Sequence, residues 1–102
     1  MSRQYTRDEV RDLFLDHVRD LIAYWANVSS DCSHEQRLEG LAHSILAVID
    51  GEGQLPAFAV IPSPHPDDKS YRQQEDMNWF PELKVELKND IGGDLHQKLL
   101  EE

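Results

Sequence analysis

The chain has 102 residues, of which 39% are hydrophobic and 29% charged, the composition of a folded globular protein rather than a disordered one. The acidic residues outnumber the basic ones by 20 to 10, and a net charge of −10 disfavours binding to nucleic acid or anionic lipid. No apolar run approaches a membrane span, the start lacks a secretory signal, and the single cysteine excludes an intrachain disulfide. We therefore expect one cytoplasmic domain over residues 1–102.

Helical signals dominate the first half of the chain. Thr6 and Glu9 have the spacing of a capping box, and the apolar residues that follow recur at three- and four-residue steps. This pattern predicts a helix over 7–28, and the same spacing after a polar break predicts a second helix over 33–50, closed by Gly51. Because the break is short, the two should form an antiparallel hairpin, with a charge-balanced first helix and an acidic second one.

The second half of the chain carries strand signals. Residues 56–61 belong to a short apolar run rich in strand formers and bounded by prolines, and residues 83–88 alternate between apolar and charged side chains. The two segments are predicted to pair as antiparallel strands. Asp94 follows two glycines and should cap a short final helix. The predicted fold is thus α+β: an antiparallel helical hairpin packed on a small antiparallel sheet, with a short C-terminal helix.

A candidate metal motif, the string Pro64-His65-Pro66-Asp67-Asp68, follows the first predicted strand. Imidazole and carboxylate are ordinary zinc ligands, and a neighbouring carboxylate could deprotonate a bound water. The string resembles the zinc motif of deacetylases that act on N-acetylglucosaminyl groups. That resemblance implies His65 and Asp68 as metal ligands and Asp67 as the general base. The competing interpretation, which we favour, is a proline-stiffened loop with an aspartate turn.

Large side chains gather in an otherwise polar stretch just downstream. They are Tyr71, Met77, Trp79 and Phe80. Such residues anchor protein interfaces, although closing a small core is their commoner use. Function is therefore to be sought first in the proline-bounded loop from Pro62 to Phe80.

These features favour a non-enzymatic protein–protein interaction module, because no set of catalytic residues and no required cofactor can be recognised. The expected partner is another protein or a second copy of the chain, with a homodimer forming through the first helix or the Trp79 region. The alternatives are a metal-binding protein or small metal-dependent hydrolase using His65, Asp67 and Asp68, with zinc as the candidate metal, and an acidic mimic of nucleic acid. The mimic requires the acids of 31–52 and 82–94 to line one surface.

Two stretches also carry a likeness to known sequences. EGLAHSILAVIDG and LPAFAVIPSPHPDDKSY are similar to segments of small uncharacterised bacterial proteins, over a region that runs from about residue 25 to residue 102. The resemblance implies a bacterial origin and carries no activity.

Overall fold

The computed structural model describes residues 2–81 and 87–101, and these residues are helical or irregular. The helices in chain order are α1 (Arg7–Ala26), α2 (His34–Ile49), α3 (Asp68–Gln74), the 3₁₀ helix η1 (Leu87–Asn89) and α4 (Leu95–Leu99). No helix within the described ranges is both long enough and apolar enough to cross a membrane.

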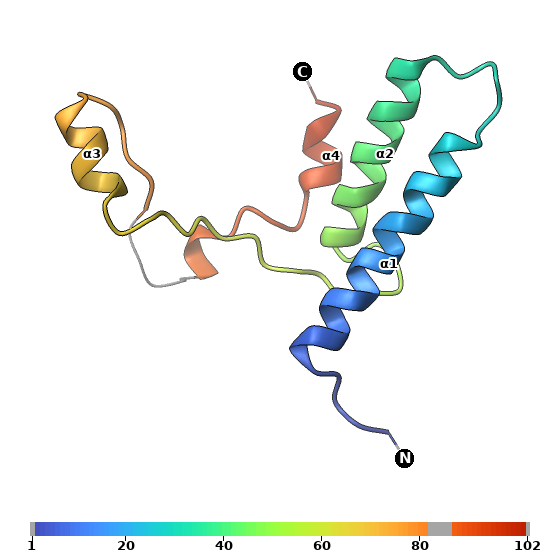
Figure 1. Ribbon diagram of the computed structural model, residues 1–102, viewed down its shortest axis with the longest axis horizontal. Helices are drawn as coiled ribbons and strands as arrows, with labels where there is room; N and C mark the ends of the chain where they lie inside the picture. Colours follow the sequence, from blue (N-terminus) through green and yellow to red (C-terminus); the bar gives the residue numbers. More distant parts are fainter. Residues whose placement is uncertain (1, 82–86, 102) are drawn as a thin grey trace.

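The two long helices begin where the sequence predicts. At the start of α1 the Thr6 hydroxyl accepts a hydrogen bond from the Glu9 N–H (3.1 Å), and the Glu9 carboxylate accepts one from the Thr6 N–H (2.9 Å). Ser33 and Gln36 form the same reciprocal pair at the start of α2. Capping boxes of this kind satisfy backbone donors that have no partner within the helix. The predicted helical hairpin is confirmed, since α1 and α2 lie side by side in Figure 1.

The end of α2 is a glycine-dependent reversal. Gly51 has φ +87°, and the Glu52 N–H donates to the Ala47 carbonyl (3.0 Å), as in a Schellman motif. A Cβ atom at Gly51 would lie 2.8 Å from the Ala57 nitrogen, so no larger residue fits there. The chain then enters residues 55–61, an extended segment that we call the strap.

The predicted sheet is not present in the described residues, and the α+β prediction is wrong there. The strap, which includes the predicted strand 56–61, is extended but belongs to no strand. Its neighbour is the segment 90–92, where the Ile91 N–H donates to the Val60 carbonyl (2.8 Å). An alternating or apolar run favours an extended chain, whereas a strand also needs a partner that continues the ladder in register. One backbone hydrogen bond does not make that ladder.

The second predicted strand, 83–88, was expected to pair with the strap, but most of it lies outside the described part of the chain. Residues 82–86 lie outside the described residues, and Leu87 begins η1. The architecture of the described residues is therefore helical, with an extended strap.

The molecule is open in shape. It extends 50 × 46 × 20 Å and has a Cα radius of gyration of 17.5 Å, compared with about 13 Å for a compact domain of this length. Figure 1 shows the α1–α2 hairpin with α4 alongside α2 on one side, and α3 at the far end of the strap on the other. Among the described residues, α3 contacts no other helix.

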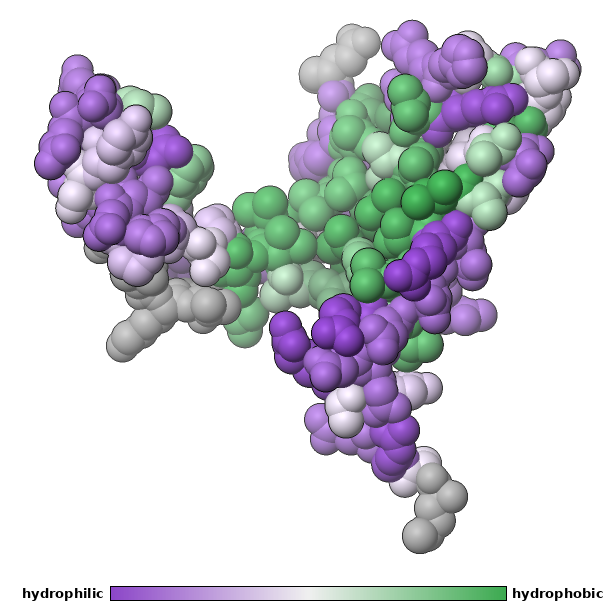
Figure 2. Space-filling model, in the orientation of Figure 1, coloured by the Kyte–Doolittle hydropathy of each residue, from purple (hydrophilic) through white to green (hydrophobic). Residues whose placement is uncertain are grey.

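The described chain has no closed hydrophobic core. None of its hydrophobic residues is buried. The described residue that is buried is an acid, Asp50, which is 8% exposed. Figure 2 shows a band of hydrophobic surface across the middle of one face, from the strap to the hairpin. The accessible surface is 8304 Å². A compact folded chain of 11.8 kDa exposes about 5,900 Å².

Candidate protein interface

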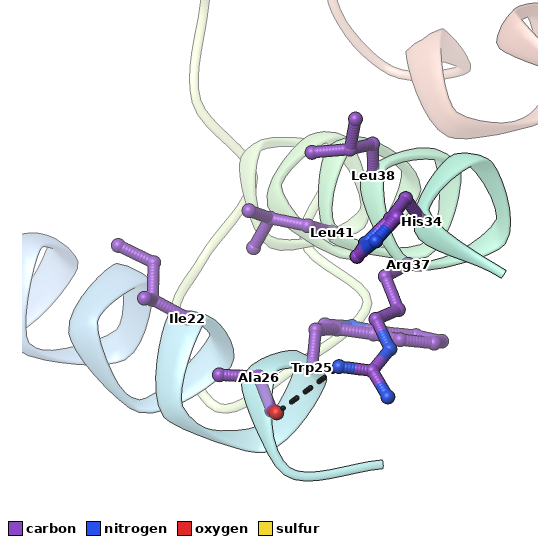
Figure 3. Close-up of a pocket in the computed structure, with 7 residues that line it drawn as sticks. All are labelled: Ile22, Trp25, Ala26, His34, Arg37, Leu38 and Leu41. Carbon is purple, nitrogen blue, oxygen red and sulfur yellow. Dashed lines mark hydrogen bonds between the residues drawn. The ribbon is translucent and has the colours of Figure 1, made fainter. Parts of the chain in front are cut away.

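An apolar groove of about 420 Å³ lies between the C-terminal half of α1 and the N-terminal half of α2 (Figure 3). We call it the hairpin groove, and it is lined by Ile22, Trp25, Ala26, His34, Arg37, Leu38 and Leu41. Two of its aliphatic side chains are well exposed, Ile22 at 51% and Leu38 at 68%. Large aliphatic groups exposed together in a groove mark a surface that another molecule can cover.

Trp25 is held in a fixed position within the groove. Its indole N–H donates to the Ser44 hydroxyl on α2 (3.0 Å). The ring lies so close to α2 that a Cβ atom at Gly40 would be 2.4 Å from the indole. Glycine at position 40 therefore permits the close approach of α1 and α2, and the aromatic ring presents a rigid surface to the groove.

Arg37 brings a positive charge to the groove lining. Its guanidinium donates to the carbonyl oxygens of Ala26, Val28 and Ser29, each at 3.3 Å. The Ala26 bond is visible in Figure 3. Arg37 thus satisfies backbone acceptors at the end of α1 and fixes the loop between the two helices. The hairpin groove combines an apolar lining with one cation in a largely acidic chain.

A second apolar hollow, of about 300 Å³, lies where the strap meets α1. Its lining consists of Val10, Arg11, Phe14, Ile49, Phe58 and Val60. Phe58 of the strap packs edge-to-face on Phe14 of α1, with ring centroids 5.6 Å apart. This contact anchors the strap on the hairpin, and the two hollows together give the hairpin an apolar face.

A buried carboxylate fastens α4 to the end of α2. Asp50 accepts hydrogen bonds from the Gly93 N–H (3.0 Å), the His96 N–H (2.8 Å) and the His96 imidazole Nδ1 (2.5 Å). We call these three residues the Asp50 clasp. The His96 ring also packs edge-to-face on His43 of α2, with centroids 5.4 Å apart. Because both carboxylate oxygens are occupied, the clasp is a structural joint between two helices.

The charge of Asp50 is stabilised by its donors. Burial by itself raises the pKa of Asp50, but the hydrogen bonds from the His96 backbone and imidazole, and from two neighbouring backbone N–H groups, lower it to about 2. The carboxylate is therefore ionised at neutral pH. Asp50 also caps the start of α4, the role that the sequence predicts for Asp94. Asp94 stands at the start of α4 but makes no side-chain capping bond.

The four large side chains proposed for partner binding all lie in residues 62–81, a segment that we call the arm. Trp79 and Phe80 fold back on α3, where the Lys69 ammonium lies 5.8 Å from the Trp79 ring and the Arg72 guanidinium 4.4 Å from the Phe80 ring. Both aromatic side chains remain half exposed, at 49% and 50%. Tyr71 and Met77 are exposed as well.

The arm does not close the core of the hairpin, which was the alternative use for these side chains. It is instead a small unit of its own, since α3 contacts no other helix in the described ranges. The apolar groups of the arm and those of the hairpin groove are therefore both left uncovered.

The proposed metal residues do not converge on one point. The His65 Nδ1 accepts a hydrogen bond from the Asp67 N–H (3.1 Å), whereas the Asp68 carboxylate accepts one from the Arg72 Nε (2.9 Å). Asp67 is exposed. Across the described ranges, no three His, Cys, Asp or Glu side chains are grouped to hold a metal ion. The arrangement is a proline-bounded turn that leads into α3.

The acids proposed for nucleic-acid mimicry are not all available as surface charges. Asp50 is buried in the clasp, and residues 82–86 lie outside the described residues.

Three features of the interface were missed from the sequence: the clasp, the close approach at Gly40 and the groove that it supports. An acid that directly follows the apolar stretch 45–49 at the end of α2 was a signal for the clasp. Its partners, however, lie 43 and 46 residues further along the chain. Gly40 gave a second signal, a glycine within a helical pattern, which often marks close packing.

Comparison with known proteins gives no further assignment: no family model, no curated protein and no solved structure matches the chain.

Proposed function

We propose that this chain is a non-enzymatic protein–protein interaction module, in which the apolar face of the α1–α2 hairpin receives side chains of another polypeptide. The observation that carries the proposal is the uncovered apolar surface. None of the described hydrophobic residues is buried, while groove residues such as Ile22 and Leu38 face solvent. Burying apolar surface contributes about 25 cal/mol per Å², so covering this face would strongly stabilise the folded chain.

The chemistry of the face favours a protein as its occupant. The groove is lined mainly by aliphatic and aromatic groups together with the fixed ring of Trp25, the residue types that dominate binding energy in protein interfaces. Nucleic acid would instead need a basic surface, and the chain carries a net charge of −10.

Site-specific photocrosslinking in cells tests the proposal. A photoreactive side chain at Leu38, within the groove, should form covalent adducts with a polypeptide. The matched control is Asp16, an exposed position on α1 outside the groove lining, which should give few adducts. The absence of protein adducts at Leu38, in a chain that retains its helical circular dichroism, would overturn the proposal.

The same crosslinking, repeated in cell lysate at low and at high salt, distinguishes apolar from charged recognition. At about 1 M salt the screening length falls to roughly 3 Å, which removes most surface electrostatic attraction. Adducts at Leu38 should persist under these conditions because contacts between apolar groups are not screened. Their loss would show that the acidic surface, rather than the groove, carries the interaction.

A further inference from the structure

We propose that the occupant of the hairpin groove is the arm of a second copy of this chain, so that two copies exchange arms reciprocally. Each arm would place Trp79 and Phe80 in the groove of the other copy, against Ile22 and Leu38. The inference rests on the proposed function and names the partner for the same surface.

The first support is the separation of the arm from its own groove. In Figure 1 the strap carries α3 away from the hairpin, and α3 contacts none of the other helices in the described residues. Three alternating prolines, Pro62, Pro64 and Pro66, connect the strap to α3. Proline fixes its own φ and keeps the preceding residue out of helical geometry, so this connector resists folding back on the hairpin. A second copy can bring an arm to the groove without bending that connector.

The second support is that arm and groove complement each other. Trp79 and Phe80 each have a cation near the ring, from Lys69 and Arg72, and each retains about half of its surface exposed. The groove offers apolar side chains at a comparable level of exposure. Residues 62–81 carry four acids and two bases, and the hairpin that bears the groove is acidic as well. The fit of the arm to the groove therefore rests on contact between apolar groups rather than on charge.

The third support is the amount of surface left uncovered. The chain exposes 8304 Å². That value exceeds by about 2,400 Å² the surface expected for a compact folded chain of this mass. Two copies would together have about 4,800 Å² to hide, which falls within the range of roughly 2,000 to 5,000 Å² buried by obligate homodimers. Exchange of an element between identical chains is an established route to such a dimer.

The test measures mass by light scattering or sedimentation on the full chain. The native protein should have twice the chain mass of 11.8 kDa at micromolar concentration. The double variant Trp79→Ala/Phe80→Ala and the groove variant Leu38→Asp should each weaken dimerisation by at least about 100-fold. Both change exposed side chains, so the helical circular dichroism of the monomers should be retained. Tyr5→Ala, which truncates an exposed aromatic residue outside arm and groove, is the matched control and should dimerise normally.

Mixing the two weakened variants tests the reciprocity. The Leu38→Asp chain has a native arm, and the Trp79→Ala/Phe80→Ala chain has a native groove. Their mixture should form a heterodimer that retains one of the two exchanged contacts, although neither variant dimerises alone. A mixture that stays monomeric while both chains remain helical would overturn the arm exchange.

The remaining outcomes separate this inference from the proposed function. A native chain that is strictly monomeric at high micromolar concentration would overturn the arm exchange. Adducts of that monomer at Leu38 with a different protein would still support the interaction module. A dimer that survives Trp79→Ala/Phe80→Ala but is lost in Leu38→Asp would overturn the exchange and support a groove-mediated dimer of another geometry.

Discussion

The hairpin with its attached α4 and the arm are both helical, but different interactions hold them together. The hairpin has capping boxes at both helix starts, a fixed Trp25 and the Asp50 clasp, which joins groups 43 and 46 residues apart. In the arm the interactions between side chains are local, with Arg72 bonded to Asp68 and stacked on Phe80. The hairpin therefore has a tertiary structure of its own, whereas the arm is ordered by its neighbours in sequence.

This contrast shows how a chain can specify its helices without specifying a closed domain. Caps and local ion pairs fix the backbone, but they bury little apolar surface, and burial is the main favourable contribution to folding. The hairpin should therefore unfold cooperatively with α4, and the arm should open separately at a lower free energy. The following four predictions test that difference, from the largest expected effect to the smallest.

Removing the charge of the clasp should have the largest effect. Asp50→Asn retains the shape of the side chain but loses a charged acceptor shared by Gly93 and His96, and should lower the free energy of unfolding by about 3 kcal/mol. Chemical denaturation measures the loss, and hydrogen exchange at the His96 amide should become fast. Glu52→Gln removes the same charge from an exposed position two residues away and should change the stability little. Equal effects of the two substitutions would contradict a structural role for the clasp.

Acid should weaken the same joint by a comparable amount. The folded pKa of Asp50 is about 2, below the value of about 3.9 for an unfolded aspartate. The contribution is therefore fully present above about pH 4 and is lost as the pH falls toward 2, for a total of about 2 kcal/mol. Denaturation at a series of pH values should show this decline in the native chain. In Asp50→Asn the decline over this range should be smaller, and an identical decline would show that other carboxylates cause it.

Crowding the contact between α1 and α2 should have an intermediate effect. Gly40→Ala improves helix propensity by about 1 kcal/mol, but the added methyl collides with Trp25 and overpacking costs about 1–3 kcal/mol. We expect a net destabilisation of about 1 kcal/mol and a change in Trp25 fluorescence, measured in a Trp79→Phe background. Gly53→Ala is the matched control, because a Cβ atom there meets open space. A Gly40→Ala chain more stable than its parent would contradict the close approach.

Loosening the arm should have the smallest effect and should leave the hairpin unchanged. Arg72→Gln removes the cation near Phe80 and the ion pair with Asp68, for a local loss of about 0.5 kcal/mol. Hydrogen exchange at the Met77 amide, which donates to the Arg72 carbonyl, should accelerate while the His96 amide stays protected. Arg19→Gln on α1 is the charge-matched control. Simultaneous deprotection of both amides in Arg72→Gln would show that arm and hairpin form one cooperative unit.

The parts of the fold that were predictable from the sequence are the ones set by contacts between residues a few positions apart in the chain. The capping residues Thr6 and Glu9 locate the start of α1 because their partners lie three residues away. The apolar spacing then gives the extent of both long helices. The final helix was placed correctly near Leu95, yet its acceptor is Asp50 rather than Asp94, because a contact between distant residues leaves no periodic signal in the sequence.

The sheet and the interface were not predictable for the same reason. The apolar run of the strap favours an extended chain, but pairing depends on a partner, and the described neighbour offers one backbone bond between Ile91 and Val60. The groove depends on the distance between α1 and α2, which Gly40 and Ser44 set jointly. Trp79 and Phe80 were proposed as partner-binding residues from their residue types alone. The arm-exchange proposal predicts that the groove of a second copy covers them.

The Asp50 clasp also makes the middle of the chain a closed loop, since Asp50 and Gly93 are joined across 43 positions. The entropy of closing a loop grows only with the logarithm of its length, so lengthening this one to 60 residues would cost about 0.3 kcal/mol. The arm can therefore vary in length and composition while the two anchored ends stay in place. The chain thus has the construction of a display scaffold, in which the arm could be replaced without redesigning the helices that carry it.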